Sequence, residues 1–254
     1  MESLHEKIQI FDRRSFEEGK HLKLLKGALV LMDKPLDWSS FDVVKYFRIA
    51  VKRATGLRKI KIGHAGTLDP KATGLLLLCT GKATKIIEQL MDHDKEYLAT
   101  LKLGATTPSY DTEYPEDTFY PTDHINQEAF CHALTRFEGD IMQVPPLFSA
   151  ISIGGKRAYK LARKGRDITL PSKPITIHRL ELLDFSHPQA SIKVHCGRGT
   201  YIRSLARDIG EALGSGAYLT SLRRTKTGIF AVEDAFQMEE LDKILLHADL
   251  EVDS

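Results

Sequence analysis

The chain has 254 residues, of which 42% are hydrophobic and 28% are charged, with a formal net charge of +2. This composition is typical of a globular protein that buries a full core, as one large domain or one domain with a smaller lobe. The N-terminus lacks an apolar signal segment, and the longest apolar run, residues 75–79, is too short to cross a bilayer. The three cysteines form no CxxC pair, so we expect a cytoplasmic protein without a disulfide framework or a structural zinc site.

Basic residues are concentrated in three patches, although the net charge is small. The patches are Lys52, Arg53, Arg58, Lys59 and Lys61; Lys156, Arg157, Lys160, Arg163, Lys164 and Arg166; and Arg223, Arg224 and Lys226. Acidic residues gather instead in residues 111–123 and 233–253. Taken together the patches favour a polyanion such as RNA, while any single patch is equally explained as a solvated helix face.

The first elements along the chain alternate between helix and strand. Residues 4–26 are polar and partly helical, with Gly19 as an interruption. Residues 28–32 predict a buried strand, because they are continuously apolar. A helix follows, capped by Ser39 or Ser40, and its apolar positions are Phe41, Val44, Phe47 and Val51.

The run GHAGTLDPKATGLLLL, residues 63–78, is the strongest candidate for a catalytic segment. Pro70 disfavours helical backbone at Asp69 and suits the first position of a helix, so we expect Asp69 at the mouth of an apolar helix. A carboxylate there is either a simple N-cap or a catalytic group. The residues alone leave both interpretations open.

The middle of the chain predicts further strands and helices. Residues 97–103 alternate, which predicts a strand with Tyr97, Ala99, Leu101 and Leu103 on one face. Residues 106–123 are polar and turn-rich, as in a functional loop. Then follow a helix with Phe130, Leu134 and Phe137, a strand at residues 148–153 and a short basic helix at residues 158–164.

Residues 175–185 and 190–196 predict an antiparallel pair of strands. The next segment predicts a helix that Thr200 caps, with an apolar face of Ile202, Leu205, Ala206, Ile209 and Leu213. Arg203 falls in the first turn, where the helix dipole disfavours a cation. We therefore expect a carboxylate or phosphate partner, unless this is a surface arginine at a frayed end.

Familiar nucleotide, metal and cofactor motifs are missing from the sequence. Residues 74–82 lack the glycine spacing and the hydroxyl residue of a phosphate-binding loop. The ten histidines form no HxxH or HExxH pair, and no GxSxG or dinucleotide fingerprint occurs. We therefore expect ordinary side chains to perform any chemistry, with no cofactor and no metal.

Six blocks of the sequence, in order, resemble the bacterial tRNA pseudouridine synthase B family. They are DKP followed by SS in residues 33–40, GHAGTLDPKATGLLLL in 63–78, GKATK in 81–85, KEY in 95–97, SAISIGGKRAY in 149–159 and GTYIRSLARDIG in 199–210. The resemblance extends over residues 27–235. It implies an α+β fold in which a mixed, largely antiparallel sheet has flanking helices and an active cleft across it.

The resemblance also implies an activity, the isomerisation of uridine 55 in the T-loop of tRNA to pseudouridine, without a protein partner. The base leaves its stack, is cleaved from its ribose and is rejoined through carbon. Asp69 corresponds to the family's essential aspartate, which acts either as a nucleophile on the ribose or as a base. By the same resemblance, Arg203 pairs with Asp69 and Tyr97 stacks on the uracil. His64, Lys85, Asp111 and Tyr201 match positions that bind or orient the substrate.

Each assignment has a structural alternative. His64 and Tyr97 also fit a buried core, Lys85 also fits a phosphate contact, and Asp111 also fits an Asx-type turn. The alternative functions are an RNA-binding module without catalysis, and a synthase that modifies another RNA with guide RNA and protein partners.

The resemblance divides the chain into three segments. Residues 1–26 are an N-terminal extension, residues 27–235 the catalytic domain, and residues 236–254 a C-terminal helix or tail without the PUA-type RNA-binding lobe common in the family. Asp37 stands where the family usually has glycine, which predicts an altered turn after the first strand.

Overall fold

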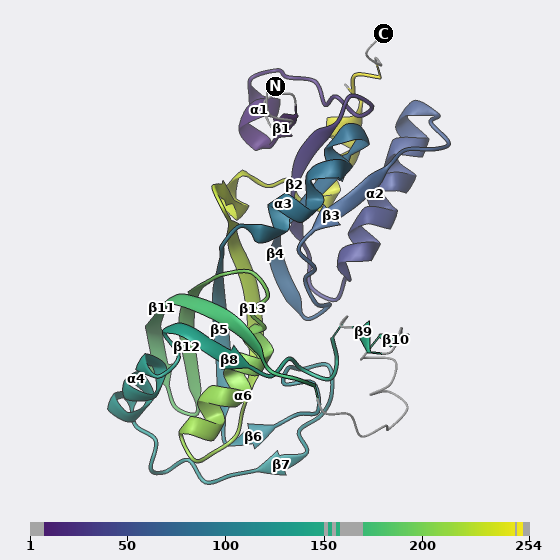
Figure 1. The fold of residues 1–254 in the computed structure, drawn as a ribbon. Helices are drawn as coiled ribbons and strands as arrows, with labels where there is room; N and C mark the ends of the chain where they lie inside the picture. The colour runs from purple at the N-terminus through teal and green to yellow at the C-terminus, as the bar shows by residue number, and fades with distance from the viewer. Residues whose placement is uncertain (1–7, 150–151, 154–155, 158–169, 247, 251–254) are drawn as a thin grey trace. The chain divides into compact units, whose positions relative to one another are not determined.

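The computed structural model describes residues 8–149, 152–153, 156–157, 170–246 and 248–250 (Figure 1). The chain divides into two compact units. Unit 1 consists of Met1–Lys95 and Arg223–Ser254, and unit 2 consists of Glu96–Leu222. No helix in the described ranges combines the length and the hydropathy that a membrane span requires.

Unit 1 is a mixed sheet with helices on both faces. Its elements are β1 (Gln9–Phe11), α1 (Arg13–Glu17), β2 (Ala28–Lys34), α2 (Ser40–Thr55), β3 (Ile62–Ala65), β4 (Ala72–Thr80), the 3-10 helix η2 (Gly81–Ile86), α3 (Ile87–Asp92), β14 (Phe230–Ala231), the 3-10 helices η3 (Val232–Asp234) and η4 (Met238–Glu240), and α7 (Leu241–Leu245). Strand β1 is parallel to β2, whereas β2 and β3 both pair antiparallel with β4. The strand predicted at residues 28–32 is therefore confirmed.

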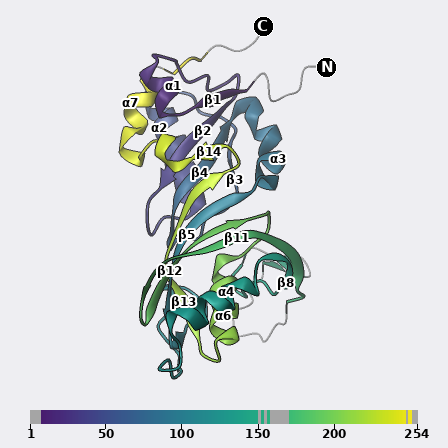
Figure 2. The ribbon, with the colours of Figure 1, turned by 90° about the vertical axis from the view of Figure 1, so that its left-hand side faces the viewer.

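Alternation along β2 and β4 sends side chains to two cores, one on each face of the unit 1 sheet. The core under α2 and α7 contains Val30, Met32, Leu76 and Leu78. The core under η2 and α3 contains Leu29, Leu31, Leu75, Leu77 and Cys79. Figure 2 shows α2 and α7 on one side of these strands and α3 on the other.

The helix expected after Asp69 is wrong, because residues 72–80 form the central strand β4. Both faces of β4 are covered, so its apolar residues run continuously instead of alternating. Such a run does not separate a buried strand from a buried helix by its periodicity. Asp69 consequently lies in a turn between two strands and not at a helix N-terminus.

Helix α2 begins as predicted but buries a different face. Ser39 is the N-cap and forms a capping box with Asp42, whose backbone N–H donates to Ser39 Oγ at 3.1 Å. Phe41 is 61% exposed, so its expected burial is wrong. The buried apolar residues are Val43, Val44, Phe47, Ala50 and Val51, which share one stripe at the helical period.

Unit 2 is a sheet in the order β13-β5-β12-β11-β8, and the chain passes between the units within β5 and β13. Figure 2 shows α4 and α6 side by side against this sheet. The elements are β5 (Lys95–Leu103), β6 (Ala105–Thr106), β7 (Thr118–Phe119), α4 (Gln127–Thr135), β8 (Gly139–Gln143), β9 (Ser152–Ile153), β10 (Lys156–Arg157), β11 (Lys173–Ser186), β12 (Gln189–Cys196), α6 (Ile202–Ala212) and β13 (Ala217–Thr227). The antiparallel β11 and β12 pair is confirmed, as is the buried face of β5.

Three details of unit 2 differ from the sequence predictions. Thr200 does not cap α6, because its hydroxyl donates to the Gly197 carbonyl at 3.1 Å and Tyr201 occupies the cap position. Phe137 lies beyond the end of α4. Within the expected strand at residues 148–153, the described part is extended only at Ser152–Ile153, and the expected helix at residues 158–164 lies outside the described residues.

Candidate active site

Residues 66–71 connect β3 to β4 and hold Asp69 in unit 1; we call them the Asp69 loop. Gly66 has a φ of +78°, a left-handed conformation that glycine adopts without strain. The hydroxyl of Ser40, the first residue of α2, accepts from Leu68 N at 2.8 Å and donates to Leu68 O at 3.0 Å. The Asp69 carbonyl accepts from Ala72 N at 3.1 Å. Hydrogen bonds on both sides of Asp69 therefore fix its backbone, and the residue is half-buried.

Arg224 lies beneath this loop and is 1% exposed. Its Nη2 donates to the Gly66 carbonyl at 2.9 Å and its Nε donates to the Leu75 carbonyl at 2.7 Å. One guanidinium thus joins the start of the loop to β4. A Cβ at Gly74 would lie 2.2 Å from the Arg224 carbonyl, so only glycine allows this close approach of the two strands.

A second buried cation, Lys34, supports the other side of the Asp69 loop. Its Nζ donates to the carbonyls of Pro35 at 2.8 Å, Trp38 at 2.5 Å and Pro70 at 3.4 Å. Burial lowers the pKa of Lys34 to about 8, and the negative charge of Asp69 opposes that change most strongly. Lys34 therefore joins the turn after β2 to the residue next to Asp69.

The pH dependence of stability should report this buried amine. Folded Lys34 titrates near pH 8 while a model lysine titrates at 10.5, so the unfolded chain binds more protons between these values. The free energy of unfolding of the wild type, relative to that of Lys34→Met, should accordingly rise with pH through this window, because the opposite contributions of Cys79 and Tyr218 are the same in both proteins. Urea denaturation of both proteins across the window measures the difference, and parallel curves would contradict the assignment.

The other two candidates of unit 1 flank the loop and η2. His64 is half-buried on β3, and its Nε2 lies 3.2 Å from Thr67 Oγ1. Burial, and then the nearby Arg224 charge, lowers the pKa of His64, so the imidazole is neutral at neutral pH. Lys85 is exposed on η2, where an ammonium group is accessible to a phosphate.

Unit 2 brings Arg203 and Asp111 together. Both side chains are about 95% buried, and Arg203 Nε lies 3.8 Å from Asp111 Oδ2. Arg203 also donates to the carbonyls of Ser109 at 3.1 Å and Phe148 at 2.8 Å. Asp111 Oδ1 accepts from Ser109 Oγ at 2.5 Å and from Glu113 N at 2.9 Å, which closes an Asx-type turn. The predicted anionic partner of Arg203 thus exists, and in unit 2 it is Asp111.

Tyr97 and Tyr201 take defined positions in the same unit. Tyr97 is 8% exposed on the buried face of β5. Tyr201 is held through its backbone at the start of α6, because Gln143 accepts from its N–H at 2.9 Å and donates to its carbonyl at 3.1 Å. The predicted pairing of Asp69 with Arg203 would join the two units and stays a prediction.

Sequence reasoning missed Ser40, Lys34 and Arg224 as supports of the Asp69 loop. It assigned Arg224 to an RNA-facing basic patch, which is wrong, because backbone carbonyls bind its buried guanidinium. Arg223 of the same patch forms a bidentate pair with Asp33, at 3.0 and 2.7 Å. One signal argued against a surface patch. Successive side chains of a strand point to opposite faces, so the neighbours Arg223 and Arg224 do not share a surface if they lie in a strand. The patch at residues 156–166 falls mostly outside the described residues.

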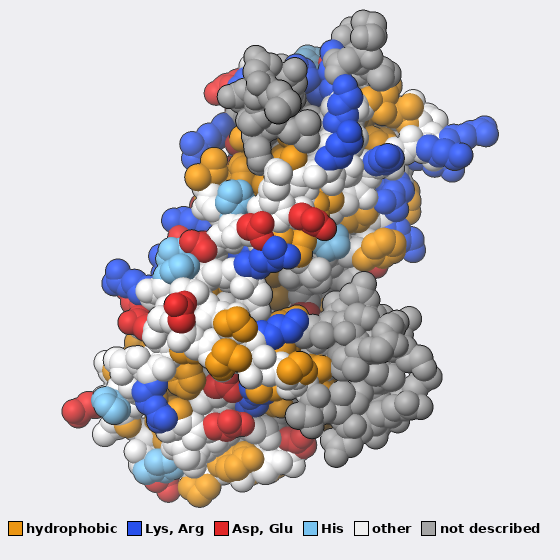
Figure 3. Space-filling view, in the orientation of Figure 1, with side chains coloured by type: hydrophobic (Ala, Val, Ile, Leu, Met, Phe, Trp, Pro, Cys, Tyr) orange, Lys and Arg blue, Asp and Glu red, His pale blue; other side chains and the backbone are white. Residues whose placement is uncertain are grey.

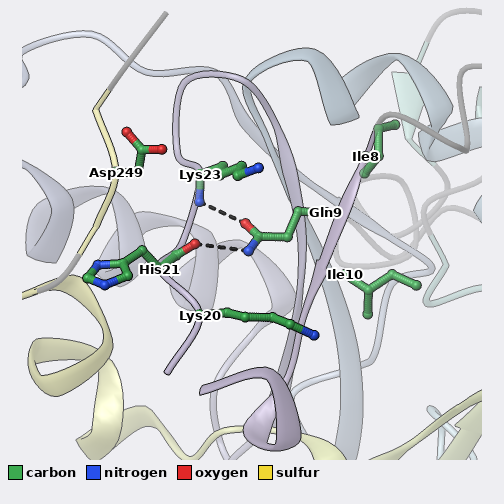
Figure 4. Close-up of a pocket in the computed structure, with 7 residues that line it drawn as sticks. All are labelled: Ile8, Gln9, Ile10, Lys20, His21, Lys23 and Asp249. Carbon is green, nitrogen blue, oxygen red and sulfur yellow. Dashed lines mark hydrogen bonds between the residues drawn. The ribbon is translucent and has the colours of Figure 1, made fainter. Parts of the chain in front are cut away.

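A hollow of about 890 Å³ lies elsewhere in unit 1, beside β1 (Figure 4). Gln9 spans its floor, donating to the His21 carbonyl at 2.9 Å and accepting from Lys23 N at 2.8 Å. None of the candidate site residues lines this hollow. We therefore do not assign a catalytic role to this hollow, despite its volume.

Comparison with known proteins identifies the family. The TruB family pseudouridylate synthase N-terminal domain matches residues 52–202, and the tRNA pseudouridylate synthase B C-terminal domain matches residues 203–254. The tRNA pseudouridine synthase B of Phocaeicola vulgatus is 53% identical over 89% of this chain and 96% of its own length. That of Bacteroides thetaiotaomicron is 52% identical over 90% of this chain and 97% of its own length.

Solved structures agree with the α+β fold. A Cbf5–Nop10–Gar1 complex matches 85% of this chain with a TM-score of 0.64 and 30% identity. The archaeal box H/ACA sRNP Nop10–Cbf5 complex matches 88% with a TM-score of 0.61 and 27% identity. This chain spans about half the length of those two, at 53% and 54%. The sequence matches and the fold together lead to one conclusion: the chain belongs to the TruB family of pseudouridylate synthases.

Proposed function

We propose that this protein converts uridine 55 in the T-loop of tRNA to pseudouridine, with Asp69 as the essential carboxylate and without a protein partner. The observation that carries the proposal is the match to relatives named tRNA pseudouridine synthase B, which extends over nearly their whole length. The Asp69 loop adds support from geometry, since buried groups of unit 1 hold its backbone on both sides. A carboxylate fixed in this way suits attack at one atom.

The reaction requires no net oxidation and no external group. The bond between ribose C1′ and uracil N1 breaks, a bond between C1′ and C5 forms, the proton on C5 leaves, and N1 gains a proton. Ionised Asp69 either attacks the ribose as a nucleophile or removes a proton from it. The uracil must leave its stack first, and an unpaired loop base costs the least to extrude.

The remaining candidates receive supporting roles in this proposal. Tyr97 stacks on the detached uracil and lies near the proton on C5. Arg203 pairs with Asp69 when substrate is bound, and this charge directs the carboxylate. His64, Lys85, Asp111 and Tyr201 orient the RNA around the flipped base.

Purified protein and a single tRNA transcript test the proposal. We expect release of tritium from uridine labelled at C5, up to one equivalent per tRNA, and no release when uridine 55 is replaced by cytidine while other uridines keep the label. Release that persists with the cytidine tRNA would move the target to another uridine. No release from either RNA, with binding retained, would contradict the proposed reaction.

A second candidate, a synthase with guide RNA and protein partners, gains support from the likeness to complexes that contain Cbf5. The bacterial relatives favour the stand-alone enzyme, because they are more similar and match this chain over nearly their full length. Activity of the purified chain on free tRNA separates the two.

A further inference from the structure

Four exposed cations surround the C-terminal end of α2: Lys52, Arg58, Lys59 and Lys61. We call them the α2-end basic surface. In the space-filling view, Lys and Arg side chains gather over α2 and the loop after it (Figure 3). Within the described part of the chain, none of these four forms an ion pair, whereas their neighbour Arg53 does so with Asp242.

The backbone that carries these cations is anchored. Gly56 ends α2 in a left-handed conformation, with φ of 74°, and its N–H donates to the Lys52 carbonyl at 3.0 Å. Leu57 and Ile60 pack against the core under α2. The Lys61 carbonyl accepts from Gly81 N at 2.9 Å. The charges therefore project from a fixed loop, which reduces the ordering cost of binding an anion.

The helix dipole explains only part of this charge. Lys52 lies in the last turn of α2, where a cation is stabilised. Arg58, Lys59 and Lys61 lie beyond the helix and repel one another without a neighbouring acid. A row of unpaired cations on a fixed backbone is complementary to a polyanion with regularly spaced charges, which describes the phosphate backbone of RNA.

Helix α2 and strand β3 both connect this surface to the Asp69 loop. The first residue of the helix, Ser40, bonds to Leu68 of the loop, and the last turn of the helix carries Lys52. Sixteen helical residues span about 24 Å, and Lys61 directly precedes β3, whose four residues lead to the same loop. We propose that the α2-end basic surface binds the phosphate backbone of the substrate tRNA at nucleotides other than the target uridine. The identity of the RNA in this inference rests on the proposed function.

A quadruple variant tests the inference: Lys52→Gln, Arg58→Gln, Lys59→Gln and Lys61→Gln. We expect the Kd for full-length tRNA to rise about tenfold or more near physiological salt. The slope of log Kd against log salt should fall by roughly 0.9 for each phosphate that the variant no longer binds. The single-turnover rate at saturating tRNA should stay unchanged.

The matched control removes the same charge from other exposed positions: Lys20→Gln, Arg136→Gln, Lys173→Gln and Arg179→Gln. An equal loss of affinity in this control, or none in the first variant, would overturn the inference. If the quadruple variant fails to fold, Arg58→Gln with Lys59→Gln should give about half the change in slope. A wild type that makes no pseudouridine but binds tRNA through this surface would refute only the proposed reaction.

Discussion

Replacing Asp69 by asparagine should reduce pseudouridine formation by about 10³-fold or more, while tRNA binding persists. The substitution keeps the size of the side chain and removes its charge, so neither nucleophilic attack nor proton abstraction is possible. The surrounding loop should keep its conformation, because Ser40, Lys34 and Arg224 hold it through backbone atoms. Tritium release from tRNA labelled at C5 of uridine, at saturating enzyme, measures the loss.

Asp37→Asn is the matched control for this substitution. Asp37 lies on the adjacent turn, and its N–H donates to the Pro70 carbonyl at 2.9 Å. Its carboxylate forms a direct, solvent-exposed ion pair with Lys71 at 2.7 Å. Such a surface pair stabilises the protein by less than about 1 kcal/mol. Asparagine also tolerates its left-handed backbone, with φ of 64°. Activity of Asp37→Asn should remain near wild type, and an equal loss in both variants would argue against a specific role for Asp69.

Replacing Arg224 by methionine should destabilise the protein by about 3 kcal/mol or more. The variant keeps most of the side-chain volume but leaves the buried carbonyls of Gly66 and Leu75 without their donor. The same change frees the start of the Asp69 loop, so the turnover of the folded fraction should fall as well. Urea denaturation gives the first effect, and single-turnover rates at low temperature give the second.

Arg48→Met is the control that separates the specific effect of Arg224→Met from the general effect of removing an arginine. Arg48 is exposed on α2 and donates at 3.1 Å to the carbonyl of Ile62, the first residue of β3. Water replaces that donor when it is removed, so the cost should stay below about 1 kcal/mol. Similar losses for Arg224→Met and Arg48→Met would contradict the buried role of Arg224.

Sequence reasoning succeeded where local patterns determine structure. The cap at Ser39 follows from the residue type that favours a helix start, and the alternation along β5 and most of the apolar stripe of α6 follow from short-range periodicity. Leu213, the last predicted member of that stripe, lies beyond the end of α6. It failed at residues 72–80, because burial on both faces removes the alternation that marks a strand. Whether both faces of that strand are covered depends on the whole sheet, so the sequence of the strand itself does not indicate it.

The candidate site shows the same division. Asp69 was found because Gly66, Pro70 and the flanking blocks are contiguous in sequence. Arg224 was placed on the surface because its partners, Gly66 and Leu75, lie about 150 residues away and offer only backbone carbonyls. Every residue has a backbone carbonyl, so the residue types in the sequence do not reveal which carbonyl binds Arg224. The Asp111 partner of Arg203 was missed for a related reason, since only the fold brings residues so distant in sequence within 3.8 Å.

Segments from the N-terminal and the C-terminal part of the chain pack together inside unit 1. Phe11 of β1 stacks on Phe236 at 5.5 Å, and Arg13 of α1 donates to Glu240 at 2.7 Å. Synthesis on the ribosome runs from the N-terminus, so β1, β2 and α2 emerge long before the residues that complete their core. Unit 2 is continuous in sequence and is synthesised in between. The segment that carries Asp69 must therefore wait for the synthesis of Arg224 before its loop can close, and until then its apolar strands lack part of their core.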